Sequence, residues 1–242
     1  MHWHKPYDAI VEHVVRIETP NGSGTGFLFG YNADNTVAAI ATASHVVDRC
    51  HDWRQPIKLV HDSSKTEVFL DHSERVVFLD RRRDSASILV LADKLPLPKA
   101  PLPLMDATKM KKVGVELAWV GYPSVAYPKL CFFTGCVSAF LTDDDCYLID
   151  GVAINGVSGG PVFASIGDGQ PELVGSISAY MPNRVGGSTL PGLLRAQDIA
   201  PFHETLKTIK SLDEARTKEQ EQASQQPLPP PAPQADPATG GT

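Results

Sequence analysis

Apolar residues in this chain gather in short runs separated by glycine, asparagine, aspartate and proline. Between residues 10 and 95 the runs are rich in Val, Ile and Leu, and they include AIVEHVVRIE, GSGTGFLFGY, TVAAIATASHVV, PIKLVHD, TEVFLD, ERVVFLD and SASILVLA. Short apolar runs with turn residues between them favour a sandwich or barrel over alternating strands and helices. We therefore expect an N-terminal β-barrel over residues 10–95.

A second group of strand-like runs fills residues 113–200: VELAWVGYP, LCFFTGCVSAFL, CYLIDGVAI, GGPVFAS and PELVGSISAY. Between the two groups, four prolines in DKLPLPKAPLPLMD favour a stiff, extended connection. We interpret residues 93–112 as a linker between two barrels. The predicted fold is all-β, with two packed antiparallel β-barrels.

The pattern changes to a helical one at residues 198–222. Asp198 is a suitable N-terminal cap, Pro201 suits a first helical turn, and Phe202, Leu206 and Ile209 fall on one face. Residues 223–242 are polar and proline-rich, which predicts a disordered tail, either a passive end or a tether for a partner.

Composition narrows the classes of function. The chain of 242 residues carries a net charge of −6, which argues against nucleic-acid binding, and the run at 81–83 (RRR) is interpreted as a solvated turn. No stretch is apolar enough for a signal peptide or a membrane span, so we expect a cytoplasmic protein without a membrane partner. The four cysteines lack zinc-site spacing and are expected to be reduced thiols. Neither a metal nor a cofactor is implied.

The stretch NGVSGGPVF places Ser158 among three glycines. A serine hydroxyl is a weak nucleophile at neutral pH and needs an adjacent base, usually a histidine oriented by a carboxylate. Of the eight histidines, only His45 lies in an apolar, small-residue setting, which predicts that it ends a buried strand. Asp84, between a charged turn and the run SASILVL, is the candidate carboxylate, with Asp80 and Asp71 as weaker alternatives.

The glycines around Ser158 allow two further interpretations. Gly156 permits a bend in which its own N–H and that of Ser158 converge as an oxyanion hole. A simple glycine turn or bulge is the alternative. The letters also fit the Gly-x-Ser-x-Gly elbow of α/β-hydrolases, but that fold needs a helix after the serine and a histidine after the acid. Pro161 and the order of residues disfavour it.

Three segments, TASHVV at His45, DSASILVL at Asp84 and GVSGGPVF at Ser158, resemble the motifs of trypsin-like, chymotrypsin-fold serine peptidases, in that family's order. The resemblance covers about residues 10–212. It is closest to the HtrA/Deg-like branch, with GSGTGFLF, GYP and VGSISAY as supporting features, and it implies two six-stranded barrels. A PDZ domain is not recognisable after the peptidase region.

The resemblance implies roles for particular residues. Ser158 would be the nucleophile, His45 the general base and acid, and Asp84 the group that orients His45. The backbone of Gly156 and Ser158 would form the oxyanion hole. Val152 would lie at the base of the specificity pocket and favour a small or medium apolar side chain. The segment formed by Ser176, Ile177 and Ser178 would pair with the substrate backbone.

The leading hypothesis is therefore a serine endopeptidase that acts on protein or peptide substrates through an acyl-enzyme. Because an unrestrained cytoplasmic protease would damage its host, we expect regulation, for example by a protein partner. The alternative hypotheses are a catalytically silent peptide-binding module on a peptidase fold and a chaperone-like structural protein.

Overall fold

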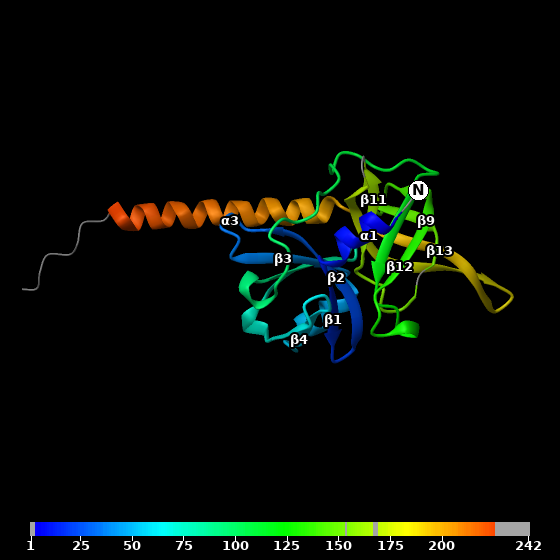
Figure 1. Cartoon of the computed structure of the whole chain (residues 1–242), viewed down its shortest axis with the longest axis horizontal. Coiled ribbons are helices and arrows are strands. Elements are labelled where there is room, and N and C mark those ends of the chain that lie inside the picture. The colour runs from blue at the N-terminus through cyan, green and yellow to red at the C-terminus, as the bar shows by residue number, and fades with distance from the viewer. Residues whose placement is uncertain (1–2, 153, 167–168, 226–242) are drawn as a thin grey trace, which may run out of the picture.

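The computed structural model describes residues 3–152, 154–166 and 169–225. Thirteen strands and three α-helices form two β-units and an outlying helix within these residues (Figure 1). The helices are α1 (His4–Val11), α2 (Ser44–Asp52) and α3 (Ala200–Gln225). The all-β fold class predicted from the sequence is confirmed, and so is its C-terminal helix.

The N-terminal unit is a half-barrel sheet with the strand order β5-β4-β1-β2-β3-β7-β6 and antiparallel pairing throughout. It has seven strands in place of the expected six. The first strand starts later than expected, because Ile10 and Val11 belong to α1. The bounds are β1 (Val14–Thr19), β2 (Gly22–Tyr31), β3 (Val37–Thr42), β4 (Ile57–His61), β5 (Thr66–Leu70), β6 (Val76–Asp80) and β7 (Ser85–Leu91).

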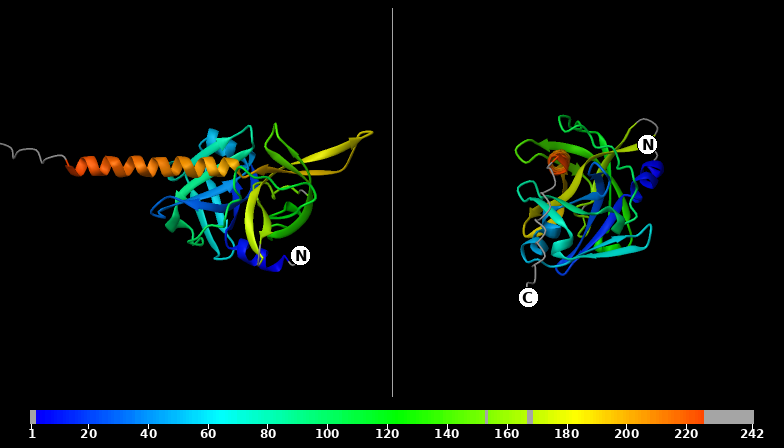
Figure 2. Two further views of the ribbon diagram at one scale, coloured as in Figure 1. Left: turned by 90° about the horizontal axis from the view of Figure 1, so that it is seen from above. Right: turned by 90° about the vertical axis from the view of Figure 1, so that its left-hand side faces the viewer.

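The C-terminal unit is a closed barrel of six strands in the order β10-β13-β12-β11-β8-β9. Its last two strands form a long hairpin that projects from the body on the side opposite to α3 (Figure 2). The bounds are β8 (Glu116–Gly121), β9 (Cys131–Leu141), β10 (Cys146–Asp150), β11 (Pro161–Ile166), β12 (Gln170–Val185) and β13 (Ser188–Asp198). The proline-rich connection packs on this barrel, since Met105 N–H donates to the Leu173 carbonyl oxygen (2.8 Å).

Strand β2 joins the two units because its side chains alternate between two cores. Leu28 points into the core of the N-terminal sheet, whereas Phe27 and Phe29 face the larger core shared with the C-terminal barrel. Phe202 of α3 packs on the same side, with ring centroids 5.7 Å from Phe27 and 5.1 Å from Phe29. The seam between the units is thus a continuous apolar layer.

Helix α3 begins as the sequence predicts and extends three residues further. Ala200 N–H donates to the Asp198 carboxylate (2.9 Å), which supports the cap, and Phe202 and Ile209 are buried. The helix keeps contact with the body as far as Asp213, whose carboxylate accepts a hydrogen bond from Ala33 N–H (2.8 Å), and then runs outward (Figure 1). The expected tail lies outside the described residues from position 226 onward. Within the described residues, helices that combine the length and apolarity needed to cross a bilayer are absent.

Candidate active site

His45 is the second residue of helix α2 and does not end a strand as the sequence suggested. Strand β3 stops at Thr42, and helix α2 starts at Ser44, whose N–H donates to the Asp84 carbonyl oxygen (3.2 Å). Val47 and Cys50, one helical turn apart, bury the inner face of this helix. The side chain of His45 is 49% exposed, so helix α2 fixes its backbone while part of the imidazole remains open to solvent.

The Asp84 carboxylate lies immediately before β7 and accepts hydrogen bonds from three groups. His45 Nδ1 is 2.9 Å from Oδ2, and the His45 backbone N–H donates to Oδ1 (3.0 Å). The Ser178 hydroxyl donates to Oδ2 (2.6 Å). Two of these contacts come from His45, through its backbone N–H and its ring, so they fix the orientation of the imidazole relative to the carboxylate.

These contacts shift both pKa values in opposite directions. Burial acts to raise the pKa of Asp84, but the hydrogen bonds from His45 and Ser178 and the nearby imidazole outweigh it and hold that pKa below its usual value. The hydrogen bond to Asp84 raises the pKa of His45 above 6.5, against the opposing effect of burial. Asp84 is therefore ionised at neutral pH, and it stabilises a positive charge on His45.

The loop between β10 and β11 packs the backbone of Ser158 against β2. The Ser158 carbonyl oxygen accepts a hydrogen bond from Thr25 N–H on β2 (2.8 Å). The next residue, Gly159, has a φ of +82°, and a Cβ there would lie 2.2 Å from the Thr25 carbonyl oxygen and 2.8 Å from Ala43 N. Only glycine lets this loop press against the residues that lead into α2, two positions before His45.

Gly156 occupies the third position of a tight turn over residues 154–157. The turn is closed by a hydrogen bond from Val157 N–H to the Ile154 carbonyl oxygen (3.1 Å), and Gly156 has a φ of +94°. A Cβ at Gly156 would lie 2.2 Å from the Tyr122 carbonyl oxygen. Both the backbone angle and the close approach therefore require glycine here.

The direction of the Gly156 N–H follows from its peptide plane. The Asn155 carbonyl oxygen accepts a hydrogen bond from Ser124 N–H (2.7 Å). Because the C=O and N–H of a trans peptide point to opposite sides, the Gly156 N–H points away from Ser124. In the described part of the chain, neither this N–H nor that of Ser158 donates to a protein acceptor. Both are available to a negatively charged oxygen.

Thr25 holds this loop in position, and the sequence analysis did not identify it. Its hydroxyl donates to the Gly156 carbonyl oxygen (2.8 Å) and accepts from Tyr122 N–H (3.1 Å), and the side chain is fully buried. A threonine inside the glycine-rich run GSGTGF was the available signal, because a buried hydroxyl in such a run must find backbone partners.

Strand β12 contains the three consecutive residues expected to pair with substrate, Ser176, Ile177 and Ser178, and each has different contacts. Ile177 N–H donates to Gly160 (2.9 Å), and its carbonyl oxygen accepts from Gly159 N–H (2.7 Å), so its backbone is already used. Ser176 lies between two paired strands. Ser178 contacts Asp84 instead, which the sequence did not predict. In the described chain, the pairing of β12 with β11 ends at Ser176.

Val152 lies at the surface and is 55% exposed. The preceding residue, Gly151, packs against the buried indole of Trp119, where a Cβ would lie 2.3 Å from a ring carbon. The pocket role of Val152 remains a prediction. Groups of three or more His, Cys, Asp or Glu side chains able to hold a metal ion are absent from the described residues.

Comparison with solved structures shows that other proteins share this fold. The chain is similar to the serine endoprotease from Yersinia pestis, with a TM-score of 0.63, 15% identity and 86% of this chain covered, and it spans only 66% of that chain. It is also similar to Rv3671c from M. tuberculosis H37Rv in two inactive-form structures. The first, a serine-to-alanine mutant, has a TM-score of 0.57 and 18% identity, with 94% of this chain and 95% of that one covered. The second has a TM-score of 0.57 and 19% identity, with 84% and 91% covered.

A search among curated proteins found no match. The family described as trypsin-like peptidase domain matches residues 24–175, which is more than half of the chain. That segment holds Thr25, His45, Asp84, Gly156 and Ser158, and the match is consistent with the HtrA/Deg-like resemblance in the sequence. With its half-barrel, its closed barrel and this site at their seam, the chain belongs to the trypsin-like peptidase domain family.

Proposed function

We propose that this protein is a serine endopeptidase that hydrolyses peptide bonds through Ser158, His45 and Asp84. The observation that carries the proposal is the pairing of His45 with Asp84, together with a serine loop in which the N–H groups of Gly156 and Ser158 donate to no acceptor in the described part of the chain. The family membership supports peptidase chemistry, and the three residues supply its usual parts. Protein or peptide chains are the proposed substrates.

The proposed reaction starts when Ser158 Oγ attacks the carbonyl carbon of the scissile bond. His45 accepts the hydroxyl proton on Nε2, since Nδ1 is engaged by Asp84, and then donates it to the leaving amine. Asp84 stabilises the imidazolium in between. A water molecule, deprotonated by His45, then attacks the acyl-enzyme and releases the second product and the free serine.

The negative oxygen that develops during each attack would be stabilised by the N–H groups of Gly156 and Ser158. Donors that are already oriented need no rearrangement during the reaction, and removing one donor from such a site costs about 10²–10³ in rate in other enzymes. The turn over residues 154–157 supplies this orientation in the free protein. We therefore expect the purified chain to react without an activator, which departs from the regulation expected from the sequence.

Substrate would bind as an added strand beside β12 from Ser178, just beyond the end of its pairing with β11. This places the backbone contacts one or two residues later than the segment expected from the sequence, because Ser176 and Ile177 are already paired. Val152, with no acidic group at its position, supports a preference for small or medium apolar side chains. Cleavage-site profiling on a peptide library tests that preference.

A fluorophosphonate probe tests the proposal directly, because it reacts covalently with activated serines. We expect labelling of the wild type and none of Ser158→Ala or His45→Ala. Ser211→Ala, on the exposed side of α3, is the matched control and should label like the wild type. Folding of each variant is checked by circular dichroism.

Two outcomes would separate the alternatives. Labelling only after addition of cell lysate would favour control by a protein partner. An unlabelled but folded protein that binds peptides would overturn the proposal in favour of a silent peptide-binding module.

A further inference from the structure

Asp84 has a backbone conformation that needs outside support. Its φ of +47° lies in the left-handed region, which costs a non-glycine residue about 1–2 kcal/mol even though aspartate tolerates it better than most. Asp84 is the last residue of the four-residue loop between Asp80 and Ser85, which face each other on β6 and β7. The position of its carboxylate depends on this loop.

Arg83, the residue before Asp84, is the best-anchored member of the loop. Its backbone N–H donates to Asp80 Oδ1 (3.0 Å), and its Nε donates to Asp80 Oδ2 (2.6 Å). The two terminal nitrogens donate to both oxygens of Glu204 on α3 (2.9 and 2.6 Å). The guanidinium thus joins the hairpin to the first turns of the helix with three hydrogen bonds, one to Asp80 and two to Glu204, and such paired contacts fix geometry as well as charge.

The three consecutive arginines of this loop differ in exposure and in their ion pairs. Arg83 is 13% exposed, whereas Arg81 is 54% exposed and pairs with Asp52 at the end of α2. Arg82 is 63% exposed and has one ion pair of 3.4 Å, to Asp145. Exposed ion pairs contribute little, about 0–1 kcal/mol, so the first two arginines are expected to matter much less than the third.

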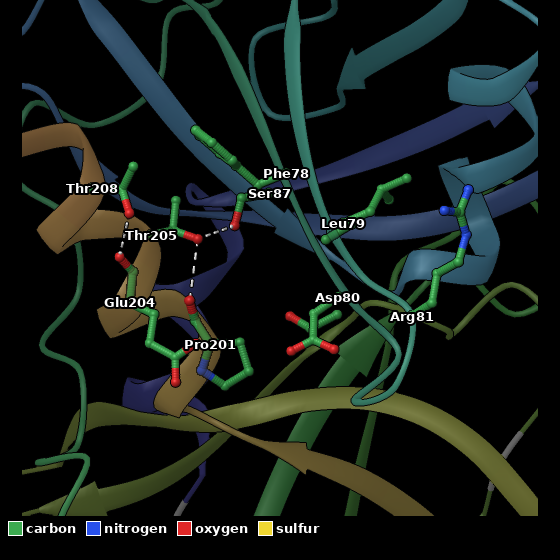
Figure 3. A pocket seen from close by; sticks show the side chains of 11 residues that line it. Phe78, Leu79, Asp80, Arg81, Ser87, Pro201, Glu204, Thr205 and Thr208 are labelled. Carbon is green, nitrogen blue, oxygen red and sulfur yellow. Dashed lines mark hydrogen bonds between the residues drawn. The ribbon is translucent and has the colours of Figure 1, made fainter. Parts of the chain in front are cut away.

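The contact between hairpin and helix borders an open cavity of about 370 Å³. Figure 3 shows Asp80 on the strand side and Glu204 with Thr205 on the helix side of this cavity. Thr205 is held by a contact between its hydroxyl and that of Ser87 on β7 (3.1 Å). The helix therefore meets this hairpin at two points, Ser87 on β7 and Arg83 in the loop.

We propose that Arg83 is a positioning residue: by tying the Asp84 loop to Glu204 of α3, it holds Asp84 in its left-handed conformation and so sets how Asp84 orients His45. This inference rests on the proposed function. The solvated turn that the sequence suggested for residues 81–83 describes Arg81 and Arg82, whereas Arg83 belongs to the support of the site.

The test uses the full chain and two readouts. The first is the rate of fluorophosphonate labelling as a function of pH. The second is the titration of the His45 ring by NMR, which needs no catalysis. Asp84 and Asp48 are the acidic groups that act on this ring. We expect Arg83→Ala to slow labelling about tenfold or more and to move the His45 titration toward lower pH. Arg83→Lys should recover part of both.

Matched controls are Arg81→Ala and Arg82→Ala, which remove the same charge from the same loop and should stay within about twofold of the wild type. Glu204→Gln, at a residue 58% exposed, keeps the test valid where Arg83→Ala fails to fold. It should show a smaller change in the same direction. Equal behaviour of Arg83→Ala and the two controls in both readouts would overturn the inference. If the wild type does not label at all, the proposed function fails, and the NMR titration still decides the role of Arg83.

Discussion

Replacement of Thr25 by valine should separate the serine loop from its support without changing the size of the side chain. The hydroxyl satisfies two buried backbone groups, the Gly156 carbonyl oxygen and Tyr122 N–H. Leaving a buried polar group without a partner costs about 1–3 kcal/mol, so two such groups predict a loss of about 2–6 kcal/mol in the free energy of unfolding. That is a large part of the 5–15 kcal/mol typical of a folded domain.

Thr25→Ser is the matched control, because it keeps the hydroxyl and removes one methyl group, at a cost of about 1 kcal/mol. Urea unfolding followed by tryptophan fluorescence measures both variants, and fluorophosphonate labelling under folding conditions measures the site. We expect Thr25→Val to be less stable than Thr25→Ser and to label more slowly. If the two variants unfold within ~0.5 kcal/mol of each other and label equally, the hydroxyl does not hold the loop.

Three further predictions follow from the same contacts. Labelling should slow as the pH falls through the raised pKa of His45, because a protonated imidazole cannot accept the serine proton, and Asp84→Asn should move this acid limb to lower pH while it lowers the maximum rate. Ser178→Ala should slow labelling about tenfold, because it removes a hydrogen bond to the Asp84 carboxylate. Ser176→Ala is the control and should label normally, since the buried Ser176 hydroxyl has no partner in the described chain. Equal labelling rates for the two variants would refute a role for the Ser178 contact. Gly156→Ala should lose at least about 1–2 kcal/mol of stability and abolish labelling, and an active, stable variant would show that the turn tolerates a side chain.

The three residues of the candidate site could be predicted because each has distinctive neighbours in the sequence. Ser158 has glycines on both sides, His45 follows small residues, and Asp84 follows a charged turn; such neighbours indicate a closely packed backbone. The order of the three residues then separates one peptidase fold from another. The geometry adds that His45 and Asp84 contact each other directly and that the Ser158 loop lies against the start of α2.

Secondary structure around His45 was harder to predict. TVAAIATASHVV is mostly apolar or small along its length, so its hydrophobic pattern does not show where the strand ends and the helix begins. The strand ends at Thr42, and the helix is marked only by Val47 and Cys50, which become inward-facing once the N-terminal sheet has formed. The division is therefore a tertiary effect.

The supporting residues depend on contacts between distant parts of the chain. Ser178 reaches Asp84 across 94 positions, and Thr25 reaches Gly156 across 131. The glycine-rich run around Thr25 signals a buried hydroxyl but not its partners, and nothing near Ser178 in the sequence distinguishes its hydroxyl from one that faces solvent. Arg83 is similar, since its partner Glu204 lies on a helix 121 positions later. Local patterns cannot reveal such partners.

Helix α3 has one more consequence for a protein with this proposed activity. Its 26 residues span about 39 Å, but among the side chains that the structure describes the buried ones lie before residue 210. Beyond Asp213, which accepts a hydrogen bond from Ala33 N–H, the helix is held mainly by its own backbone. Isolated helices of that length are marginal in water, so this part should exchange its amide protons rapidly and open often. An opened helix offers the extended backbone that a peptidase binds. Self-cleavage during storage should therefore begin in residues 214–225 and leave the two β-units intact.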